Sequence, residues 1–241
     1  MATTYRSLEI VPGETGYGRK YVWQAPVRLS HWINAFAVTT LFLTGLYIAN
    51  PALAPNGEAA NHFVMGRVRE IHFVSGYGLL FGFLLRIYCF YFGNNYSRSG
   101  FPFVWRKEWW ADLRAQGMQY LRLQRGHVHL GHNALAGLTY TIFVIFLGWC
   151  QIVTGFAMYS ESNPGGFWDH LLGWVIPLLG GSYMVHLWHH TLAWSFVVFT
   201  IIHLYIVFFD SHQFRNGLIT SIISGYKFYQ KGDLDHDRWL S

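Results

Sequence analysis

Four long apolar stretches constrain this chain more than any other feature of its sequence. A helix needs roughly 20 residues to cross the hydrocarbon core of a bilayer. Asp, Glu, Lys and Arg make up only 12% of the residues, about half the usual share in a soluble domain. The sequence therefore predicts an all-α fold, a four-helix transmembrane bundle that forms one membrane domain over residues 1–241. The predicted spans are residues 27–49, 68–92, 133–159 and 186–209.

Two shorter segments are expected to be interfacial helices. Phe167 to Leu179 is apolar but only about a dozen residues long and contains Pro177, so a surface helix or a re-entrant segment fits better than a span. Phe103 to Arg125 is basic and rich in Trp, which indicates a helix that rests on the membrane surface. The predicted bundle thus carries short interfacial helices.

The positions of Lys and Arg predict the orientation of the spans. The N-terminal segment, the loop between the second and third spans with its approaches, and the C-terminal tail hold 15 of the 17 basic residues. The opposite side keeps only Arg67 and Arg69. Because cytoplasmic loops carry the excess of Lys and Arg, both termini are expected in the cytoplasm. The formal charge of +5 comes from these loops, so it indicates membrane orientation and no nucleic-acid partner.

Histidines within the spans are the candidate functional residues, because ionisable groups at membrane depth are costly and usually functional. Four of the 13 histidines stand out: His31, His72, His189 and His203. His189 and His203 are 14 residues apart. A helix separates such residues by ~21 Å along its axis but by only ~40° around it. One helix face therefore presents two imidazoles, one near each membrane surface.

The topology predicts how these histidines pair. His31 lies in the first turns of the first span, at the cytoplasmic level of His203, while His72 enters from the outer side, level with His189. Each pair suits a haem iron held from both faces. Such bis-imidazole iron has six ligands and no open position, which favours electron transfer over oxygen chemistry. The chain has no Cys-x-x-Cys-His motif, which argues against covalently attached haem.

Several alternatives accompany this assignment. His186 or His190 replaces His189 as the outer ligand if the fourth helix begins irregularly. Arg86 follows His72 by 14 residues and either pairs with a haem propionate or extends to the interface. A lone histidine in a span is often only a hydrogen-bonding residue. The competing class is a structural anchor or transporter in which the histidines bind metal ions or nothing.

Glycines near the histidines have two interpretations. Gly45 follows His31 by 14 residues, and Gly76, Gly78 and Gly82 follow His72. They provide clearance for a porphyrin, or Gly78 and Gly82 form a small-residue contact between helices. The sequence does not decide between these two roles.

Ordered motifs along almost the whole chain resemble the b-type cytochrome subunit of membrane-bound uptake nickel-iron hydrogenases. The wider family includes the gamma subunit of respiratory formate dehydrogenase. The motifs are Ala25-Pro-Val-Arg-Leu-Ser-His-Trp, Glu70-Ile-His-Phe, Arg86-Ile-Tyr, Trp105-Arg-Lys, Gly131-His-Asn, Thr154-Gly-Phe-Ala and His186-x-Trp-His.

The resemblance implies two haem b groups in a multi-pass protein of the bacterial inner membrane. Its partners would be the iron-sulfur small subunit and the large subunit of a periplasmic nickel-iron hydrogenase, and its electron acceptor a quinone. The pattern matches His72 and His189 to the outer haem, and His31 and His203 to the inner one. The chain itself would carry no hydrogenase active site. The alternative partner is a formate dehydrogenase or another periplasmic oxidoreductase.

The implied quinone site lies near the inner haem. Asn34, one turn after His31, and Asn133, at the start of the third span, are the candidate hydrogen-bonding residues. Their structural alternatives are an interfacial polar residue for Asn34 and a helix cap for Asn133.

Overall fold

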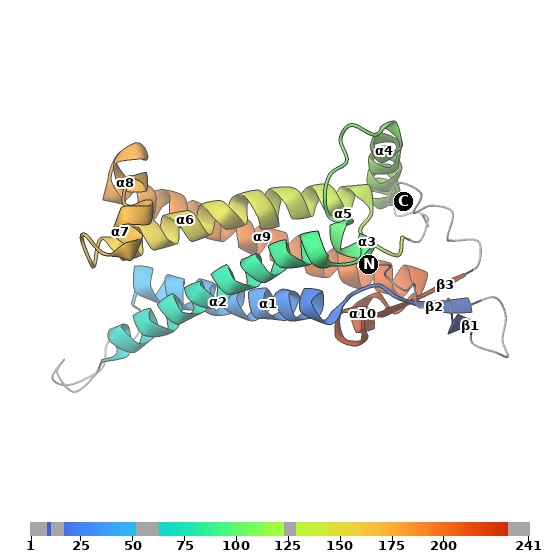
Figure 1. The fold of residues 1–241 in the computed structure, drawn as a ribbon, viewed down its shortest axis with the longest axis horizontal. Helices are drawn as coiled ribbons and strands as arrows, with labels where there is room; N and C mark the ends of the chain where they lie inside the picture. Colours follow the sequence, from blue (N-terminus) through green and yellow to red (C-terminus); the bar gives the residue numbers. More distant parts are fainter. Residues whose placement is uncertain (1–8, 11–16, 52–62, 123–128, 231–241) are drawn as a thin grey trace. The chain divides into compact units, whose positions relative to one another are not determined.

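Helices long enough to cross a membrane dominate the computed structural model, which describes residues 9–10, 17–51, 63–122 and 129–230 (Figure 1). Within these residues, four helical stretches are long and apolar enough to be spans. The all-α class and the four spans predicted from the sequence are confirmed. The spans are α1 (Ala25–Ala49), α2 (Val64–Phe92), the composite of α5 (Ala134–Thr139), the π-helix η2 (Tyr140–Phe146) and α6 (Leu147–Ser160), and α9 (Ser182–Phe214).

The ends of the spans follow local chemistry more closely than hydropathy. α1 begins at Ala25-Pro26, where the first turn tolerates a proline, and it ends before Asn50-Pro51, where a proline prevents continuation. α2 begins four residues before the predicted start, and α9 extends beyond its predicted span at both ends. Polar residues lower the hydropathy at these ends, but the backbone hydrogen bonds of the helix do not depend on side-chain polarity.

The chain forms two compact units. The helical unit comprises residues 29–87 and 145–199, and the sheet unit comprises residues 1–28, 88–144 and 200–241.

The helical unit is a four-helix bundle in which each helix contacts two others. Its α1 contacts α2 and α9, and its α6 contacts the same two helices from the other side. Aromatic packing and hydrogen bonds from histidine both contribute. Each of the four helix pairs is joined by a side-chain contact: Thr44 with His72, Phe83 with Trp149, Thr154 with His189, and Phe42 with Trp194.

Two short helices cover the end of α6 in the helical unit (Figure 1). They are α7 (Phe167–Leu172) and α8 (Val175–Leu178). The ring of Trp168 stacks on Phe156, with centroids 4.0 Å apart. The segment expected to be a surface helix or a re-entrant segment is therefore two helical turns packed on a span.

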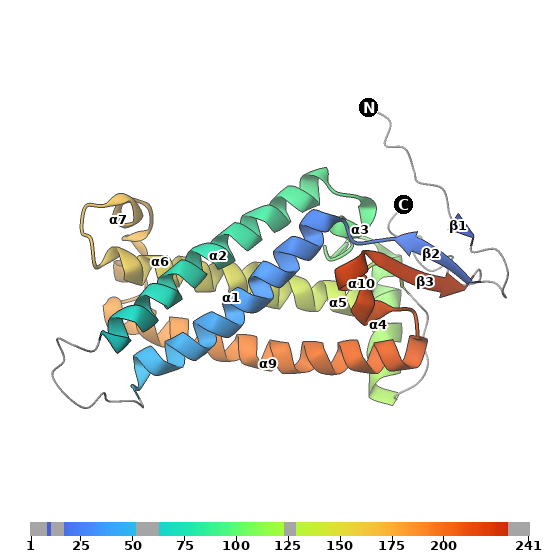
Figure 2. The ribbon, with the colours of Figure 1, turned by 90° about the horizontal axis from the view of Figure 1, so that it is seen from below.

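A small antiparallel sheet, which the sequence did not predict, organises the sheet unit (Figure 2). Its order is β1 (Glu9–Ile10), β2 (Tyr17–Tyr21) and β3 (Tyr226–Gln230), with Arg19 opposite Phe228. The β2–β3 pair joins the segment before α1 to the segment after α9. These two segments therefore lie on the same side of the membrane, as an even number of spans requires.

The loop between the second and third spans packs against the sheet segments. Asn94 accounts for much of this contact, because its backbone N–H donates to Oε1 of Gln24 and its Nδ2 donates to the carbonyl of Val22, both at 2.9 Å. The helices of this unit are α3 (Asn95–Arg98), α4 (Lys107–Arg122), in the expected interfacial segment, and α10 (Leu218–Ser224). Its buried apolar cluster consists of Val22, Trp23, Val27, Cys89, Leu130 and Tyr229.

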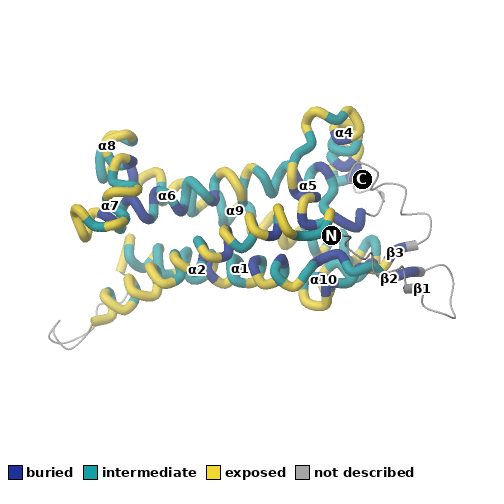
Figure 3. The backbone as a smooth tube through the Cα atoms, in the orientation of Figure 1, coloured by how far each residue is buried: buried dark blue, intermediate teal, exposed yellow. Residues whose placement is uncertain are grey.

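Many residues of the spans are exposed (Figure 3), and large apolar residues are prominent among them. Phe36 of α1 is 68% exposed, and Phe208 of α9 is 62% exposed. Apolar surface on this scale is unfavourable in water and suits lipid. The chain is therefore a multi-pass membrane protein.

Candidate functional site

His72 of α2 is held by a Thr-Gly pair on α1. The Oγ1 atom of Thr44 lies 2.8 Å from Nδ1 of His72. A Cβ atom at the next residue, Gly45, would lie 3.4 Å from Cε1 of His72, which is the near limit of ordinary van der Waals contact. The imidazole thus packs against the α1 backbone, with one nitrogen hydrogen-bonded.

His189 of α9 repeats this arrangement with a Thr-Gly pair on α6. The Oγ1 atom of Thr154 lies 2.9 Å from Nδ1 of His189, and a Cβ atom at Gly155 would lie 3.1 Å from Cε1. The amide nitrogen of Gln151 is 3.1 Å from the other ring nitrogen, Nε2. His72 on α2 and His189 on α9 both belong to the helical unit. The helical unit therefore contains both histidines predicted to pair near the outer surface, and their pairing stays a prediction.

The two alternative outer ligands have different surroundings. His186 and His190 are both exposed. Nδ1 of His186 is 2.8 Å from the carbonyl oxygen of Ser182, on its own helix. Of these three histidines, His189 is the one whose ring has hydrogen bonds to α6.

The predicted inner pair is divided between the two units. His31 belongs to the helical unit, is half-buried and has its ring edge-on to Trp32, with centroids 5.3 Å apart. His203 belongs to the sheet unit and is exposed on α9. Their pairing stays a prediction from the sequence.

Two other predicted site residues, Asn34 and Arg86, lie on α1 and α2. Asn34 faces α2, where a methyl group at Gly82 would overlap its carboxamide oxygen. This packing is the small-residue role considered for Gly82, whereas a Cβ at Gly76 or Gly78 would meet nothing within 4 Å. Arg86 is half-buried on α2.

Asn133 caps the third span, which is the structural role considered for it as the alternative to a quinone contact. Its Oδ1 accepts a hydrogen bond of 2.7 Å from the backbone N–H of Ala136, and its Nδ2 donates to Oε1 of Gln116 at 3.3 Å. Any contact with a quinone would therefore have to be made beside these two bonds.

A polar network in the sheet unit contains residues that the sequence did not single out. Asp112 of α4 accepts a hydrogen bond of 2.8 Å from the N–H of Ala134 and lies 3.3 Å from Nε2 of His129. Burial alone would raise the pKa of Asp112. The hydrogen bond and positive charge of His129 oppose burial, as do the hydrogen bonds from Ala134 and Gln116, and together they hold this pKa below its ordinary value. The network fixes the start of the third span to α4.

Tyr120 extends this network to the end of α9. Its hydroxyl donates to Oδ2 of Asp210 at 2.7 Å. Burial, followed by the charge of Asp210 and the hydrogen bond to it, raises the pKa of the Tyr120 phenol well above its ordinary value.

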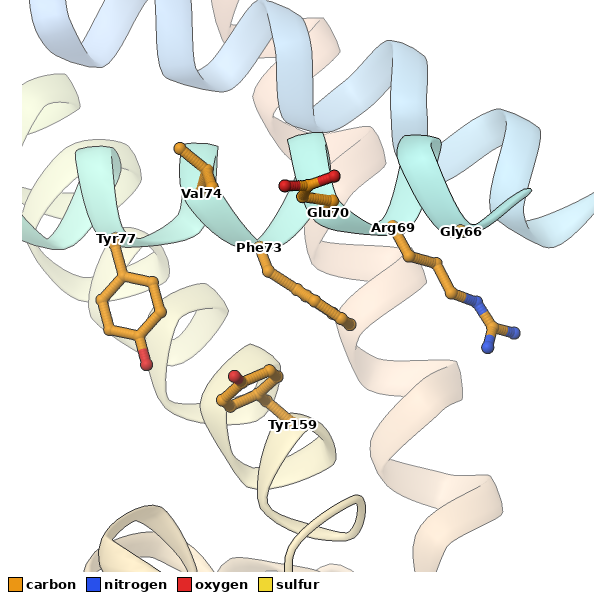
Figure 4. A pocket seen from close by; sticks show the side chains of 7 residues that line it. All are labelled: Gly66, Arg69, Glu70, Phe73, Val74, Tyr77 and Tyr159. Carbon is orange, nitrogen blue, oxygen red and sulfur yellow. The ribbon is translucent and has the colours of Figure 1, made fainter. Parts of the chain in front are cut away.

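A groove of about 470 Å³ lies on another side of α2 (Figure 4). Phe73 and Tyr77 point from α2 towards Tyr159 of α6, and the ring centroids of Phe73 and Tyr159 are 4.8 Å apart. At ~100° per residue, the groove residues of α2 lie about 60–200° around the helix from His72. The groove is therefore separate from the histidine site. Its lining residues are Gly66, Arg69, Glu70, Phe73, Val74, Tyr77 and Tyr159.

The threonine partners of the histidines were missed by the sequence reasoning, although a signal for them exists. Thr-Gly occurs at residues 44–45 and again at 154–155, each time within an apolar span. The sequence cannot give the rotation of one helix against another, so it does not show that both pairs face a histidine.

Comparison with known proteins gives consistent matches along the chain. The family described as "Prokaryotic cytochrome b561" matches residues 22–225. A protein of Azotobacter chroococcum named "Probable Ni/Fe-hydrogenase B-type cytochrome subunit" is 39% identical over 228 residues, which cover 90% of this chain and 95% of its own. A protein of Cupriavidus necator with the same name is 40% identical, covering 87% of each chain. The Escherichia coli "Probable Ni/Fe-hydrogenase 1 B-type cytochrome subunit" is 33% identical, covering 90% of this chain and 94% of its own.

Proposed function

Because this chain belongs to the prokaryotic cytochrome b561 family, we propose that it is the membrane cytochrome of a nickel-iron hydrogenase. In this role it carries electrons from the hydrogenase to a quinone through two haem b groups. The names of its relatives support the hydrogenase partner. The observation that carries the proposal is the pair His72 and His189, each held by a Thr-Gly pair within one bundle.

The residues around His72 and His189 fit a haem. Both rings are hydrogen-bonded at Nδ1, which makes Nε2 the nitrogen available to iron. Gly45 and Gly155 keep the ring edges clear of side chains. Bound haem b supplies a one-electron carrier, and two histidine ligands leave its iron no open position for oxygen. The protein's contribution is to hold both imidazoles neutral and oriented.

The inner haem is assigned to His31 and His203 by the sequence pattern. The 14-residue spacing of His189 and His203 on the continuous helix α9 repeats the ligand position towards the other membrane surface. Arg86 would neutralise a propionate there. The quinone would bind close to this haem, with Asn34 and Asn133 as the candidate hydrogen-bonding residues.

The orientation follows from the charges. The sheet unit contains the basic N-terminal segment, the basic loop with α4 and the segment after α9. We assign these three basic segments to the cytoplasmic side of a bacterial inner membrane. His72 and His189 then lie towards the periplasm, where the iron-sulfur small subunit of the hydrogenase would deliver electrons, with the large subunit beyond it.

Spectroscopy and a small set of variants test the proposal. The purified complex should show a b-type reduced-minus-oxidised spectrum and two haems per copy of this chain. His72→Ala and His189→Ala should each remove one haem and stop hydrogen-dependent quinone reduction, while hydrogenase activity towards a soluble dye persists. His190→Ala, an exposed neighbour on the same helix, is the matched control and should retain both haems.

Three results would contradict the proposal. A purified chain without a b-type spectrum would exclude a haem cytochrome. Retention of both haems in His72→Ala would exclude the assigned outer ligand. Co-purification with a formate dehydrogenase in place of a nickel-iron protein would exclude the partner.

A further inference from the structure

The two Thr-Gly pairs around the outer histidines have a role beyond helix packing. We propose that Thr44 and Thr154 are positioning residues that fix His72 and His189 in the tautomer with hydrogen on Nδ1, so that both present the Nε2 lone pair to the outer haem. This inference rests on the proposed function, in which these histidines are haem ligands.

The hydrogen bonds of Thr44 determine the direction of its bond to His72. Its Oγ1 lies 2.6 Å from the carbonyl oxygen of Thr40, 3.2 Å from that of Leu41 and 2.8 Å from Nδ1 of His72. A hydroxyl has one proton, and a carbonyl oxygen only accepts hydrogen bonds. The proton of Thr44 therefore goes to a carbonyl, and a hydroxyl lone pair accepts the hydrogen on Nδ1 of His72.

Thr154 repeats this pattern on a different pair of helices. Its Oγ1 lies 2.8 Å from the carbonyl oxygen of Cys150, 3.1 Å from that of Gln151 and 2.9 Å from Nδ1 of His189. Thr154 is buried, with 4% of its surface exposed, so water does not compete for these bonds. The same reasoning places the hydrogen of His189 on Nδ1.

Gln151 supports the tautomer of His189 from the other side of the ring. Its amide nitrogen lies 3.1 Å from Nε2 and donates an N–H to it, which requires a lone pair on Nε2. Iron would use this same lone pair, so coordination requires the Gln151 side chain to turn away. Its other amide atom, Oε1, is buried without a hydrogen-bond partner among the described residues. Oε1 therefore does not oppose a rotation of the Gln151 amide away from His189.

The glycine that follows each threonine also contributes to the orientation of the histidine ring. In each pair the residue after the threonine faces Cε1, the ring atom between the two nitrogens, at a virtual Cβ distance of 3.4 Å for Gly45 and 3.1 Å for Gly155. Each threonine fixes one ring nitrogen, and at Gly155 the missing Cβ lets the ring edge approach the helix more closely than a side chain would allow. Together they define the direction of Nε2.

The hydrogen bond also has an electronic consequence. Accepting the Nδ1 hydrogen raises the basicity of a histidine ligand and favours the more positive state of the metal. Thr44 and Thr154 should therefore lower the midpoint potential of the outer haem, and their removal should raise it. Loss of such partners typically costs about 10–100-fold in metal affinity.

The test uses Thr→Val variants in the complete complex. Thr44→Val and Thr154→Val should each shift the outer haem to a more positive midpoint potential, change its ferric low-spin EPR signal and lower its affinity about 10-fold or more. Thr44→Ser and Thr154→Ser retain the hydroxyl and should restore all three readouts. Thr39→Val is the matched control, because Thr39 makes the same bond along α1, to Ala35 at 2.9 Å, but is exposed and faces no histidine.

The outcomes separate this inference from the proposed function. Wild type with two haems, of which His72→Ala removes one, upholds the function. If Thr44→Val and Thr154→Val then match Thr39→Val in potential and EPR signal, the inference is wrong. Where a valine variant does not fold, Thr44→Ala and Thr154→Ala remove the hydroxyl with less bulk, and the same comparison decides.

Discussion

One added methyl group at Gly155 tests how tightly His189 is confined. In Gly155→Ala the new Cβ would lie 3.1 Å from Cε1 and 3.7 Å from Nδ1 of His189. Ordinary van der Waals contact begins at 3.4 Å. The ring or the helix must therefore move by a few tenths of an ångström. The ring cannot move without stretching its bond to Thr154.

Two opposing terms set the size of the effect. Overpacking of this kind costs about 1–3 kcal/mol. Replacing glycine by alanine within a helix contributes roughly 1 kcal/mol in the opposite direction. The net change in protein stability is then a loss of ~0–2 kcal/mol. If the strain instead turns the His189 ring away from the iron, each ~1.4 kcal/mol of lost binding free energy lowers haem affinity about tenfold.

Other glycines provide the controls for this series. In Gly45→Ala the Cβ would lie 3.4 Å from Cε1 of His72, an ordinary contact, so the outer haem should be nearly unaffected. In Gly78→Ala the Cβ would meet nothing within 4 Å, and the variant should keep both haems and gain ~0.5–1 kcal/mol in stability. Haem content, the ferric EPR signal and the thermal unfolding midpoint measure the three variants side by side. Full outer haem with an unchanged EPR signal in Gly155→Ala would refute the confinement of His189, as would an equal loss of haem in Gly78→Ala.

Further predictions concern the polar network and the inner pair. Because the pKa of Asp112 is lowered in the folded protein, its carboxylate stabilises the fold above its ordinary pKa of 3.8, and this contribution disappears as pH falls through the lower folded value. Asp112→Asn should remove this acid dependence from thermal unfolding curves. An unchanged pH dependence of unfolding in this variant would contradict the prediction. Because its pKa is raised, Tyr120 should stay protonated through pH 10, and Tyr120→Phe, which deprives Asp210 of its donor, should cost about 1–3 kcal/mol in thermal or denaturant unfolding. His31→Ala and His203→Ala should remove the same haem, as judged by redox titration; removal of different haems would disprove their pairing.

The spans could be predicted from the sequence because membrane crossing needs a length and polarity that few other segments have. The choice among His186, His189 and His190 could not, because each step of one residue turns the side chain by ~100° and a small error in helix phase exchanges them. The comparisons confirm the family indicated by the motifs around His31, His72 and His189.

The sheet escaped prediction for a different reason. β2 and β3 are five residues each and lie in polar segments far apart in the chain, so neither has a hydrophobic pattern that marks a strand on its own. Their pairing depends on tertiary contacts, such as the Lys227 ammonium 5.4 Å from the ring centroid of Trp23. Strand propensity of this kind is set by packing more than by the local sequence.

The pairing of β2 with β3 also sets an order of assembly. β3 is synthesised only after all four spans, so the outer edge of β2 lacks its partner until the last helix has entered the membrane. Contacts between such distant segments close a very long loop and form late in folding. Completion of this sheet therefore marks the moment at which the chain has finished inserting. A chain stalled before its fourth helix would display an unpaired strand edge, which is a template for pairing with another chain.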